Sequence, residues 1–306
     1  MTKVLVATEK PFAPAAVKGI RKIVEDAGFE LVLLEKYTDP KSLIDAVASV
    51  DALIIRSDKV NRQVIEAAQK LKIVVRAGAG YDNIDLAAAT ENNIVAMNTP
   101  GQNSNAVAEL ALGMMVYFAR KQFSGSSGTE LLGKNLGIHA YGNVGKCVAR
   151  IAKGFGMKVY AYDPFVPKEI IEKDGVVNVE SVEELYSRCQ YISLNIPANA
   201  QTKKSINFEL LSKMPEGATL VNTARKEVID EDGLLKMFAE RKDFGYLSDI
   251  APDCKDKIES EYAGRFFFTP KKMGAQTSEA NINAGLAAAS QIVNFILHGD
   301  DTFKVN

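Results

Sequence analysis

One stretch, residues 136–163, constrains the fold of this chain more than any other part of the sequence. A short apolar run ends at Gly142, and apolar residues then recur at helical spacing over 144–155. Residues 158–162 alternate like a strand, which stops at Asp163. A strand, a tight turn, a helix and a second strand in this order predict a βαβ unit, which requires a parallel sheet covered by helices.

The turn in this unit reads Ala-x-Gly-x-x-Gly, with Ala140 where the dinucleotide-binding pattern has its first glycine. In that pattern, glycines let backbone N–H groups approach a pyrophosphate at a helix N-terminus. An acid about 20 residues further on accepts hydrogen bonds from ribose hydroxyls. Asp163 stands 18 residues beyond Gly145. Because an acid there would repel a 2′-phosphate, the sequence predicts NAD rather than NADP as the cofactor.

Length and charge narrow the class of protein. The 306 residues are enough for two domains, each with its own core. With 37 Lys and Arg against 38 Asp and Glu, the net charge of −1 indicates no nucleic-acid partner and no anionic membrane surface. The three cysteines have no C-x-x-C spacing, which indicates a reducing compartment and no metal site. The N-terminus lacks signal-peptide features and no apolar run reaches the roughly 18 residues of a membrane span, so we expect a cytoplasmic protein.

Strand-like and helix-like segments alternate along both halves of the chain. This alternation predicts two α/β domains, each with a Rossmann-like or flavodoxin-like parallel sheet. Long helices at 104–120 and 278–297 enter and leave the second domain, so we expect it to be inserted into the first. The predicted domains are a substrate-binding domain of residues 1–98 and 278–306, and an NAD-binding Rossmann domain of residues 99–277.

The remaining elements follow from the same periodicity. The polar, Gly- and Ser-rich segment 121–135 is predicted to be a linker ahead of the nucleotide-binding part. Further strands are predicted at 4–7, 31–34, 52–55, 74–77, 95–97, 191–195, 219–222, 244–248 and 266–268, and further helices at 15–26, 41–47, 61–68, 84–91, 208–213 and 231–239.

Polar side chains follow several predicted strands, where the loops of a parallel sheet open onto a ligand crevice. The loops 56–59 and 76–80 follow two neighbouring strands of the first half. Arg225 follows the strand 219–222. Arginine can hold a carboxylate through two parallel charge-assisted hydrogen bonds, and a surface arginine at a helix start is an equal alternative on position alone.

Two further loops carry titratable side chains. Asp249 and Asp253 follow the strand 244–248 and could orient a base or contact a cofactor, with a solvated acidic loop as the alternative for Asp253. Lys271 and Lys272 follow the last predicted strand. A lysine in a partly desolvated pocket can transfer protons, whereas two adjacent lysines before a helix are more often simply solvated.

Histidine is scarce in this sequence, since only His139 and His298 are present. His139 falls inside a predicted strand, as a core residue would, and His298 falls at the end of the last helix. Neither follows a strand at the predicted ligand edge. A mechanism that uses histidine as its acid–base is therefore hard to build here.

Five segments, in order, resemble the D-isomer-specific 2-hydroxyacid dehydrogenase family, and within it the branch that oxidises 3-phosphoglycerate. They are RSDKV (56–60), RAGAGYDNIDLAAAT (76–90), NTPGQNSNAVAELALGMM (98–115), the stretch 136–163 and VNTARKEVIDEDGL (221–234). The resemblance covers nearly the whole chain. It implies NAD-dependent oxidation of D-3-phosphoglycerate to 3-phosphohydroxypyruvate, which opens serine synthesis, by a homodimer that forms through its nucleotide-binding domains.

The resemblance also implies a role for individual residues. Arg225 matches the arginine that binds the carboxylate of the 2-hydroxyacid and polarises the reacting carbonyl. The implied substrate contacts are Ala77, Gly78 and Ala79 for the carboxylate, Arg56, Ser57 and Lys59 for the distal phosphate, and Asn103. The implied cofactor contacts are Gly142, Asn143 and Val144 for the pyrophosphate, Asp163 for the ribose, Pro197, Thr223 and Asp249 for the nicotinamide half, and Gly274.

This chain departs from the family at its acid–base positions. The family pattern T-P-H-x-G-A reads T-P-K-K-M-G-A here, so a lysine replaces the histidine. Counting from Gly274 places Lys272 at the histidine position, and counting from the preceding Thr-Pro places Lys271 there. We favour Lys272, because the helix after Gly274 holds the geometry. The partner glutamate of the family is replaced by Cys254, and Asp253 could substitute for it with a shift of one residue.

A lysine can still serve the chemistry. An unperturbed lysine has a pKa of about 10.4, so at neutral pH it donates a proton, as reduction of a keto acid requires. Oxidation requires the neutral amine, and therefore a lowered pKa or a more alkaline optimum. Arg225 and the second lysine would lower that pKa, while an anionic substrate would raise it. Our hypothesis is that Lys272 is the acid–base.

Two other functions remain open. A reductase of another 2-keto acid, such as hydroxypyruvate or glyoxylate, would not need Arg56 and Lys59. A non-catalytic, NAD-sensing scaffold resembling corepressor relatives would not need Arg225, whose presence argues against it. The sequence leaves no room after the last helix for the C-terminal regulatory domain of longer relatives, so we expect no serine feedback through such a domain.

Overall fold

The computed structural model describes residues 1–306, which form two compact units. Unit 1 comprises Met1–Asn103 and Thr277–Asn306, and unit 2 comprises Ser104–Gln276. Relative to the limits expected from the sequence, the first junction falls five residues later and the second falls one residue earlier. The expected α/β class, with two parallel sheets, is confirmed.

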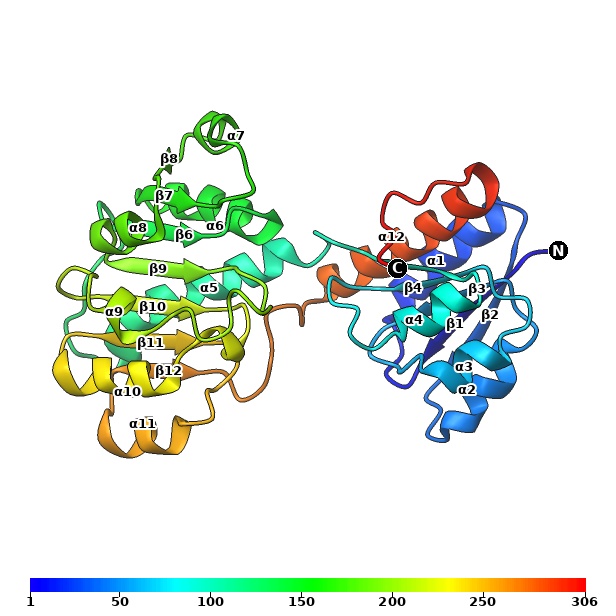
Figure 1. The fold of residues 1–306 in the computed structure, drawn as a ribbon, viewed down its shortest axis with the longest axis horizontal. Coiled ribbons are helices and arrows are strands. Elements are labelled where there is room, and N and C mark those ends of the chain that lie inside the picture. Colours follow the sequence, from blue (N-terminus) through cyan, green and yellow to red (C-terminus); the bar gives the residue numbers. More distant parts are fainter. The chain divides into compact units, whose positions relative to one another are not determined.

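Unit 1 is built on a five-stranded parallel sheet with strand order β2-β1-β3-β4-β5 (Figure 1). Side chains alternate along β1, so that Leu5 and Ala7 pack with α2, α3 and α4, while Val4 and Val6 pack with α1 and α12. Because both faces are covered, these strands are apolar along nearly their whole length. The elements are β1 (Lys3–Thr8), α1 (Pro14–Asp26), β2 (Glu30–Glu35), α2 (Pro40–Val47), β3 (Ala52–Ile55), α3 (Arg62–Ala67), β4 (Ile73–Arg76), α4 (Leu86–Glu91), β5 (Val95–Asn98) and α12 (Ser278–His298).

Helix α12 corrects one expectation from the sequence. It has 21 residues and a window of mean hydropathy 1.2, so by length and composition alone it could cross a membrane. The interspersed Asn and Gln residues interrupt its apolar runs, and the sequence analysis therefore found no such segment. In the structure α12 packs along α1, with Ala284, Ala288 and Ile292 buried in the core of unit 1. The core helix of a globular unit passes the same test of length and composition.

The C-terminal tail covers the outer edge of the unit 1 sheet. Lys304 forms an antiparallel bridge with Met97 of β5. The backbone N–H of Val305 donates to the carbonyl oxygen of Ala96 at 2.9 Å, and the N–H of Ala96 donates to Asn306 Oδ1 at 2.8 Å. These bonds satisfy backbone groups that an edge strand would otherwise expose.

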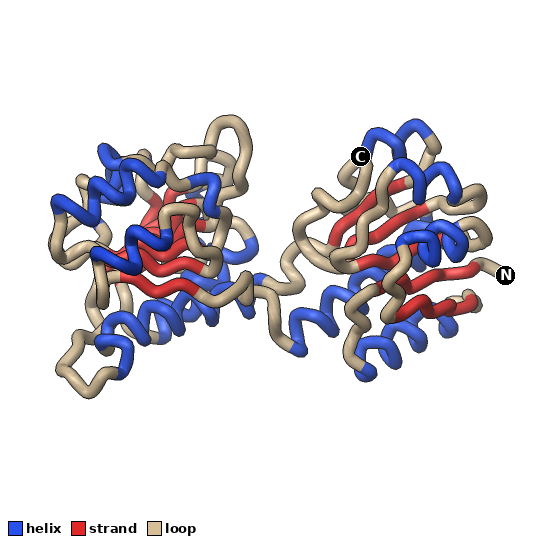
Figure 2. The backbone as a smooth tube through the Cα atoms, turned by 90° about the horizontal axis from the view of Figure 1, so that it is seen from below, coloured by secondary structure: helices blue, strands red, loops and turns tan.

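Unit 2 is built on a seven-stranded parallel sheet with strand order β12-β11-β10-β9-β6-β7-β8 (Figure 1). Helices lie on both sides of its strands (Figure 2). The order reverses beside β6, where the chain leaves for β7 on one side and returns to β9 on the other. The elements are α5 (Ser104–Ala119), β6 (Asn135–His139), α6 (Asn143–Gly154), β7 (Lys158–Tyr162), α7 (Lys168–Lys173), β8 (Val177–Asn178), α8 (Val182–Arg188), β9 (Tyr191–Leu194), α9 (Phe208–Leu211), β10 (Thr219–Asn222), α10 (Glu231–Glu240), β11 (Gly245–Ser248), α11 (Lys255–Glu261) and β12 (Phe266–Phe268).

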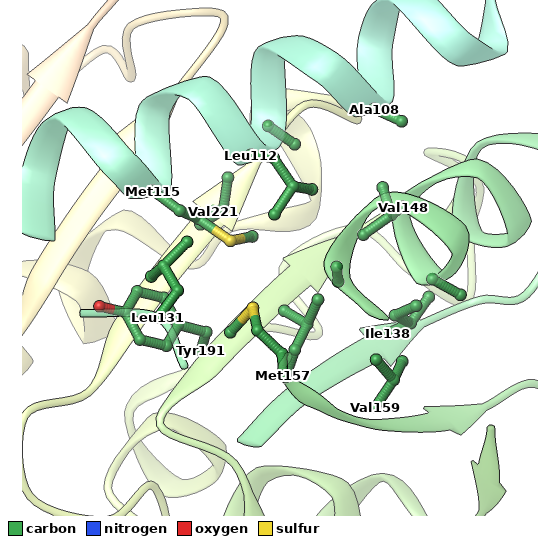
Figure 3. Packing of buried hydrophobic residues seen from close by; sticks show 14 of the residues in the cluster. Ala108, Leu112, Met115, Leu131, Ile138, Val148, Met157, Val159, Tyr191 and Val221 are labelled. Atoms are coloured by element: carbon green, nitrogen blue, oxygen red, sulfur yellow. The ribbon is translucent and has the colours of Figure 1, made fainter. Parts of the chain in front are cut away.

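One of the two buried clusters of unit 2 joins α5 and α6 to the sheet. Met115 of α5 lies beside Val221 of β10, and Val148 of α6 lies over Ile138 of β6 (Figure 3). All four side chains are fully buried, and none of them carries a hydrogen-bonding group. The apolar cluster of α5 that the sequence contains is therefore core packing.

The segment 121–135 is not a linker, contrary to the prediction. It lies wholly within unit 2. The N–H of Thr129 donates to the carbonyl oxygen of Ala119 at 2.8 Å, Gln122 Nε2 donates to the carbonyl oxygen of Phe266 at 2.9 Å, and Leu131 is only 5% exposed. Its polar composition suggested a free connection, but side-chain and backbone contacts fix it against α5 and β12.

The strands and helices predicted from periodicity are present, with ends that differ by at most two residues. The sequence analysis missed α7, β8, α8 and α11. The three helices are short and rich in charged residues, so their apolar period spans at most two turns and carries little signal, and β8 has only two residues.

The register of unit 2 places the carboxyl ends of its strands at one edge. His139 pairs with Leu194, Leu194 with Asn222, and Asn222 with Ser248, which in turn pairs with Phe268. Every loop that leaves one of these residues therefore starts at the same level of the sheet. This edge is where a ligand meets a parallel α/β sheet.

His139 ends β6 and makes stability depend on pH. Its ring lies edge-on to Tyr186, with Nδ1 3.3 Å from the tyrosine hydroxyl, and burial lowers its pKa to about 4, against a smaller opposing effect of Asp163. Between pH 6.5 and 4 the unfolded chain binds a proton at this residue that the folded chain does not. We therefore expect the free energy of unfolding to be highest above pH 6.5 and to fall by roughly 3 kcal/mol towards pH 4 through this residue.

Urea unfolding at pH 7.5 and pH 4.5 measures this effect. In the His139→Phe variant the free energy of unfolding should fall less between these two pH values, by about the contribution of His139, because phenylalanine has no group that can be protonated. His298 is exposed at the end of α12, so His298→Gln is the matched control and should keep the decrease of the wild type. An unchanged pH dependence in His139→Phe would contradict the assignment.

Candidate functional site

The turn between β6 and α6 has the geometry of a dinucleotide-binding turn. Gly142 is the N-cap of α6, and a Cβ added there would meet no heavy atom within 4 Å. A Cβ at Gly145 would lie 2.5 Å from the carbonyl oxygen of Ala140, so only glycine lets α6 approach β6 this closely. The second glycine therefore leaves open space for a ligand and the third serves helix–strand packing, as the pattern requires.

Ala140, at the first glycine position, has a φ of +77°. An L-residue rarely adopts this left-handed region, and glycine does so without a steric penalty. The backbone of Ala140 is therefore strained where a glycine would not be.

The N-terminus of α6 is free to bind an anion. It has no side-chain cap, whereas α8, α9 and α10 of the same unit are capped by Ser181, Asn207 and Asp230. The first N–H groups of a helix lack partners within the helix and carry a partial positive charge. Asn143 and Val144, predicted to contact the pyrophosphate, are the first two residues of α6. These features fit a pyrophosphate without any adjustment of the chain.

Asp163 follows the end of β7 and holds the turn as well as facing the ligand edge. Its Oδ2 accepts a hydrogen bond from the N–H of Tyr141 at 2.7 Å, and its Oδ1 accepts one from the N–H of Phe165 at 2.8 Å. The Tyr141 side chain is fully buried, and its hydroxyl donates to Asp174 at 3.0 Å. A carboxylate oxygen has a second lone pair, so these bonds still allow Asp163 to accept from ribose hydroxyls.

Arg225 is placed by a buried asparagine at the end of β10. Asn222 Oδ1 accepts from the N–H of Ala224 at 3.0 Å, and its Nδ2 donates to the carbonyl oxygen of Arg225 at 3.0 Å and to the Tyr246 hydroxyl at 3.2 Å. Asn222 is 2% exposed and Tyr246 is fully buried, so the loop 223–225 has a fixed shape. Arg225 itself is half-buried and donates one Nη1 hydrogen bond to the carbonyl oxygen of Ala224.

Asp249, expected beside the nicotinamide, is bonded to the lysine loop. It is 2% exposed, its Oδ1 accepts from the N–H of Met273 at 2.7 Å, and its Oδ2 accepts from the N–H of Gly274 at 2.8 Å. Lys271 and Lys272 are exposed in this loop, at the carboxyl edge of the sheet. Gly274, predicted on the cofactor side, is buried against Asp249.

Asp253 pairs with a surface lysine. Its carboxylate lies 2.5 Å from Lys226 Nζ and is 77% exposed, so its charge is largely solvated. Glu231, the first residue of α10, accepts the N–H groups of Asp253 and Cys254 at 2.7 and 2.8 Å. Burial, and then the charge of Glu231, raise the pKa of the Cys254 thiol to about 12. The position of the family's glutamate is thus a neutral thiol.

Two buried polar atoms at this edge have no partner in the chain. They are Oγ1 of Thr223, which follows β10, and Oδ1 of Asn195, which follows β9. Unsatisfied buried polar atoms are rare in folded proteins and often belong to a ligand site. Thr223 was predicted as a cofactor contact, but Asn195 was missed, because the predicted strand 191–195 includes it whereas β9 ends at Leu194. Pro197, also predicted, is exposed two residues further on.

In unit 1, Arg56 is partly committed to the chain. Its guanidinium donates to the carbonyl oxygens of Lys10 and Pro11 at 3.1 and 3.3 Å and to Asn281 Oδ1 at 2.5 Å, and it lies over the Phe12 ring. Burial lowers the pKa of Arg56 from its ordinary value. These contacts reduce the number of its N–H groups that could meet a phosphate. The neighbouring predicted residues, Ser57 and Lys59, are exposed.

A buried aspartate that the sequence analysis passed over shapes this loop. Asp58 is 3% exposed and accepts hydrogen bonds from the N–H of Glu9 at 2.7 Å, the Tyr37 hydroxyl at 2.8 Å and the N–H of Arg56 at 3.2 Å. Asn83 Nδ2 donates to the carbonyl oxygen of Asp58 at 2.7 Å. Asp58 therefore joins four loops at the carboxyl edge of the unit 1 sheet.

The loop 77–79 also needs its glycine. Gly78 has a φ of +147°, and a Cβ there would overlap the guanidinium of Arg76. Arg76 Nε donates to the carbonyl oxygen of Arg56 at 3.1 Å, and Asn98 Nδ2 donates to the carbonyl oxygen of Ala79 at 2.6 Å. Arg76 was not among the predicted site residues, although it is an arginine at the end of β4. Asn103, which was predicted, is the half-buried last residue of the first segment of unit 1.

Comparison with known proteins agrees with this geometry. Residues 115–263 match the NAD binding domain of the D-isomer specific 2-hydroxyacid dehydrogenases. A D-3-phosphoglycerate dehydrogenase of Methanocaldococcus jannaschii is 36% identical over 91% of this chain and 55% of its own length. A hydroxypyruvate reductase of Thermotoga maritima is 36% identical over 86% of this chain and 90% of its own length.

A solved structure is similar over the full chain. The NAD⁺-bound 3-phosphoglycerate dehydrogenase of Entamoeba histolytica is 51% identical, covers 100% of this chain and 98% of that chain, and has a TM-score of 0.87. Several curated phosphoglycerate dehydrogenases are longer, and this chain spans about half of their length.

The strained Ala140 leads to a prediction. Ala140→Gly should raise the free energy of unfolding by about 0.5–1 kcal/mol, because the relief of left-handed strain exceeds the added entropy of a glycine in the unfolded chain. The dissociation constant of NAD should change by less than about threefold, since a glycine at this position keeps the same backbone conformation. Urea unfolding and calorimetric titration with NAD measure the two quantities.

Gly145→Ala is the matched control in the same turn. Its Cβ would collide with the carbonyl oxygen of Ala140, so we expect loss of stability and at least about tenfold weaker NAD binding. A destabilised Ala140→Gly, or a neutral Gly145→Ala, would contradict this description of the turn.

Proposed function

The chain belongs to the D-isomer-specific 2-hydroxyacid dehydrogenase family, and on that basis we propose that it oxidises D-3-phosphoglycerate to 3-phosphohydroxypyruvate with NAD. The single observation that carries the proposal is the edge of the unit 2 sheet. The dinucleotide-binding turn, the fixed loop of Arg225 and the lysine loop all start there, from β6, β10 and β12 of one parallel sheet. The names of several relatives support the choice of substrate.

Arg225 is proposed to bind the carboxylate next to the reacting carbon. A guanidinium can donate two parallel hydrogen bonds to a carboxylate, and the bonds of Asn222 to the loop 223–225 keep it from adjusting its position. The same positive charge favours the partial negative charge on the oxygen of the forming carbonyl. In unit 1, the loop 77–79 is proposed to contact the substrate carboxylate as well.

Lys272 is proposed to accept the hydroxyl proton of the substrate. When bound, NAD⁺ accepts the hydride that leaves the same carbon, so the alcohol becomes a ketone. A lysine amine must be neutral to accept the proton, and it returns a proton in the reverse reaction. Neither Asp253, which pairs with Lys226, nor the neutral Cys254 offers the lysine a buried carboxylate partner like the family's glutamate. We therefore expect the oxidation rate to rise towards alkaline pH.

The residues around the turn are proposed to hold the cofactor. Asn143 and Val144 at the start of α6 would hold the pyrophosphate and Asp163 the adenosine ribose. Thr223 and Asn195 have the buried polar atoms that lack a partner in the chain, and they would face the nicotinamide half. A 2′-phosphate would meet the carboxylate of Asp163, which supports a preference for NAD.

We also propose a cytoplasmic homodimer that forms through unit 2. Phe123 and Leu132 are each 66% exposed and Phe155 is 43% exposed, and all three flank the end of α5. Exposed apolar side chains of this size favour burial against a second copy.

The substrate is tested with an absorbance assay at 340 nm, using NAD and 3-phosphoglycerate beside a panel of unphosphorylated 2-hydroxy acids, and NADH with hydroxypyruvate. We expect the highest kcat/KM with 3-phosphoglycerate. Lys59→Ala should raise its KM by about tenfold, which corresponds to the loss of one charge-assisted phosphate contact, and should leave the KM of hydroxypyruvate within about twofold.

Lys22→Ala is the matched control, since Lys22 is an exposed lysine of unit 1 that pairs with Asp26 on α1. It should change neither KM. If hydroxypyruvate is the better substrate and Lys59→Ala affects both substrates equally, the runner-up function, a hydroxypyruvate reductase like that of T. maritima, replaces this proposal.

The role of the lysines is tested by Lys272→Ala and Lys271→Ala. Removing a general acid–base should lower kcat by about 10²–10⁴-fold, so we expect this loss in Lys272→Ala and less than about tenfold in Lys271→Ala. Steady-state rates from pH 6 to pH 10 give both values. The alkaline rise of the wild type should disappear in Lys272→Ala. Losses below tenfold in both variants would refute a lysine acid–base.

A further inference from the structure

We propose that Asp249 and Thr269 form a clamp that fixes the backbone on both sides of Lys272, and that this clamp selects Lys272 over Lys271 as the acid–base. The inference rests on the proposed function and adds to it two positioning residues. Neither of them needs to touch the substrate to act. Their effect is to hold the Cα of Lys272, and thus the root of its side chain, at one place on the ligand edge.

The two peptide groups that flank Lys272 are both hydrogen-bonded. The peptide after it is held through the N–H of Met273, which donates to Asp249 Oδ1 at 2.7 Å. The peptide before it is held through the carbonyl oxygen of Lys271, which lies 2.9 Å from Thr269 Oγ1. The N–H of Gly274 adds a third bond, to Asp249 Oδ2 at 2.8 Å. Fixing both flanking peptides fixes the position of the Lys272 Cα and the direction in which its side chain leaves the backbone.

Lys271 is held less completely. Of the two peptide groups that flank Lys271, only the one between Lys271 and Lys272 takes part in the clamp, through the Lys271 carbonyl oxygen. The peptide before it follows Pro270 and is outside the contacts of Asp249 and Thr269. A group that is placed in advance loses less entropy when it reaches the reacting proton. The geometry therefore favours Lys272.

The clamp is itself anchored in the sheet. Asp249 and Thr269 are 2% and 5% exposed. The N–H of Asp249 donates to the carbonyl oxygen of Asn222 at 3.0 Å, and the N–H of Thr269 donates to the carbonyl oxygen of Ser248 at 3.1 Å. These bonds continue the ladders of β10, β11 and β12 by one residue. The lysine loop and the loop of Arg225 are thus fixed to the same three strands.

Two details make the clamp intolerant of change. A Cβ added to Gly274 would lie 3.0 Å from Asp249 Oδ2 and 3.2 Å from a methyl group of Val107, so a larger residue would push the loop away from the carboxylate. Thr269 Oγ1 lies 2.7 Å from the carbonyl oxygen of Asp249, besides its contacts with Lys271 and Asp249 Oδ1. The hydroxyl has one proton to donate to these three oxygens, so its removal affects all three contacts.

Thr269→Val removes the hydroxyl and keeps the shape of the side chain. We expect kcat to fall by about tenfold or more while the KM of NAD stays within about twofold, because the cofactor contacts are kept. Thr269→Ser restores the donor and should return kcat to within about threefold of the wild type. Thr219→Val is the matched control: Thr219 is a threonine 2% exposed at the opposite end of β10, and its substitution should leave kcat unchanged.

A double-mutant cycle separates a positioning role from a general loss of structure. If the clamp acts through Lys272, Thr269→Val should have little further effect in the Lys272→Ala background, so the two losses are not additive. In the Lys271→Ala background its full effect should remain. Additive losses with Lys272→Ala, or a kcat of Thr269→Val within twofold of the wild type, would overturn the proposal.

Hydrogen exchange tests the clamp without any turnover. The amides of Met273 and Gly274 should exchange at least about tenfold faster in Thr269→Val than in the wild type, while amides of β10 stay protected. Unchanged exchange at both amides would overturn the clamp even in an active enzyme. Faster exchange in a protein that lacks activity towards 3-phosphoglycerate would support the clamp and refute the proposed substrate, so the two failures can be told apart.

Discussion

The parallel register of the unit 2 sheet is the constraint on which the rest of this structure depends. Because His139, Leu194, Asn222, Ser248 and Phe268 lie at one level, every loop that follows them begins at the same edge. Residues that are far apart in the sequence are thereby brought to the same edge of the sheet. The dinucleotide-binding turn, the arginine loop and the lysine loop are three separate loops with one common origin.

Several polar side chains, of which Asn222 and Asp249 are buried and Asp163 is partly buried, make this common edge rigid. Asp163, Asn222 and Asp249 each stand one residue beyond or at the end of a strand, and each accepts backbone N–H groups of the loops there. A carboxylate or amide oxygen buried in this way is stabilised by the N–H groups, and the loop in turn takes a single conformation. Asp58 has the same place and effect in unit 1. The residues predicted to contact a ligand therefore also hold the loops of the ligand site in place.

Much of the fold could be predicted from the sequence, because strands buried on both faces and amphipathic helices of three or more turns carry a clear period. The short charged elements α7, α8 and α11 could not, since their packing is decided by neighbours far along the chain. In the site, Arg225 and the lysines could be named from their place after strands. The partners of Asp249 and Asp253, and the strain at Ala140, depend on backbone geometry that no spacing of residues encodes.

The thiol at Cys254 has a consequence for chemical modification. Burial raises the pKa of this thiol to about 12, so it is protonated at neutral pH, and it is the thiolate that reacts with electrophiles and peroxides. The negative charge of Glu231 also raises this pKa, because it disfavours a second negative charge on the sulfur. Cys254 should therefore react slowly with covalent inhibitors and with oxidants.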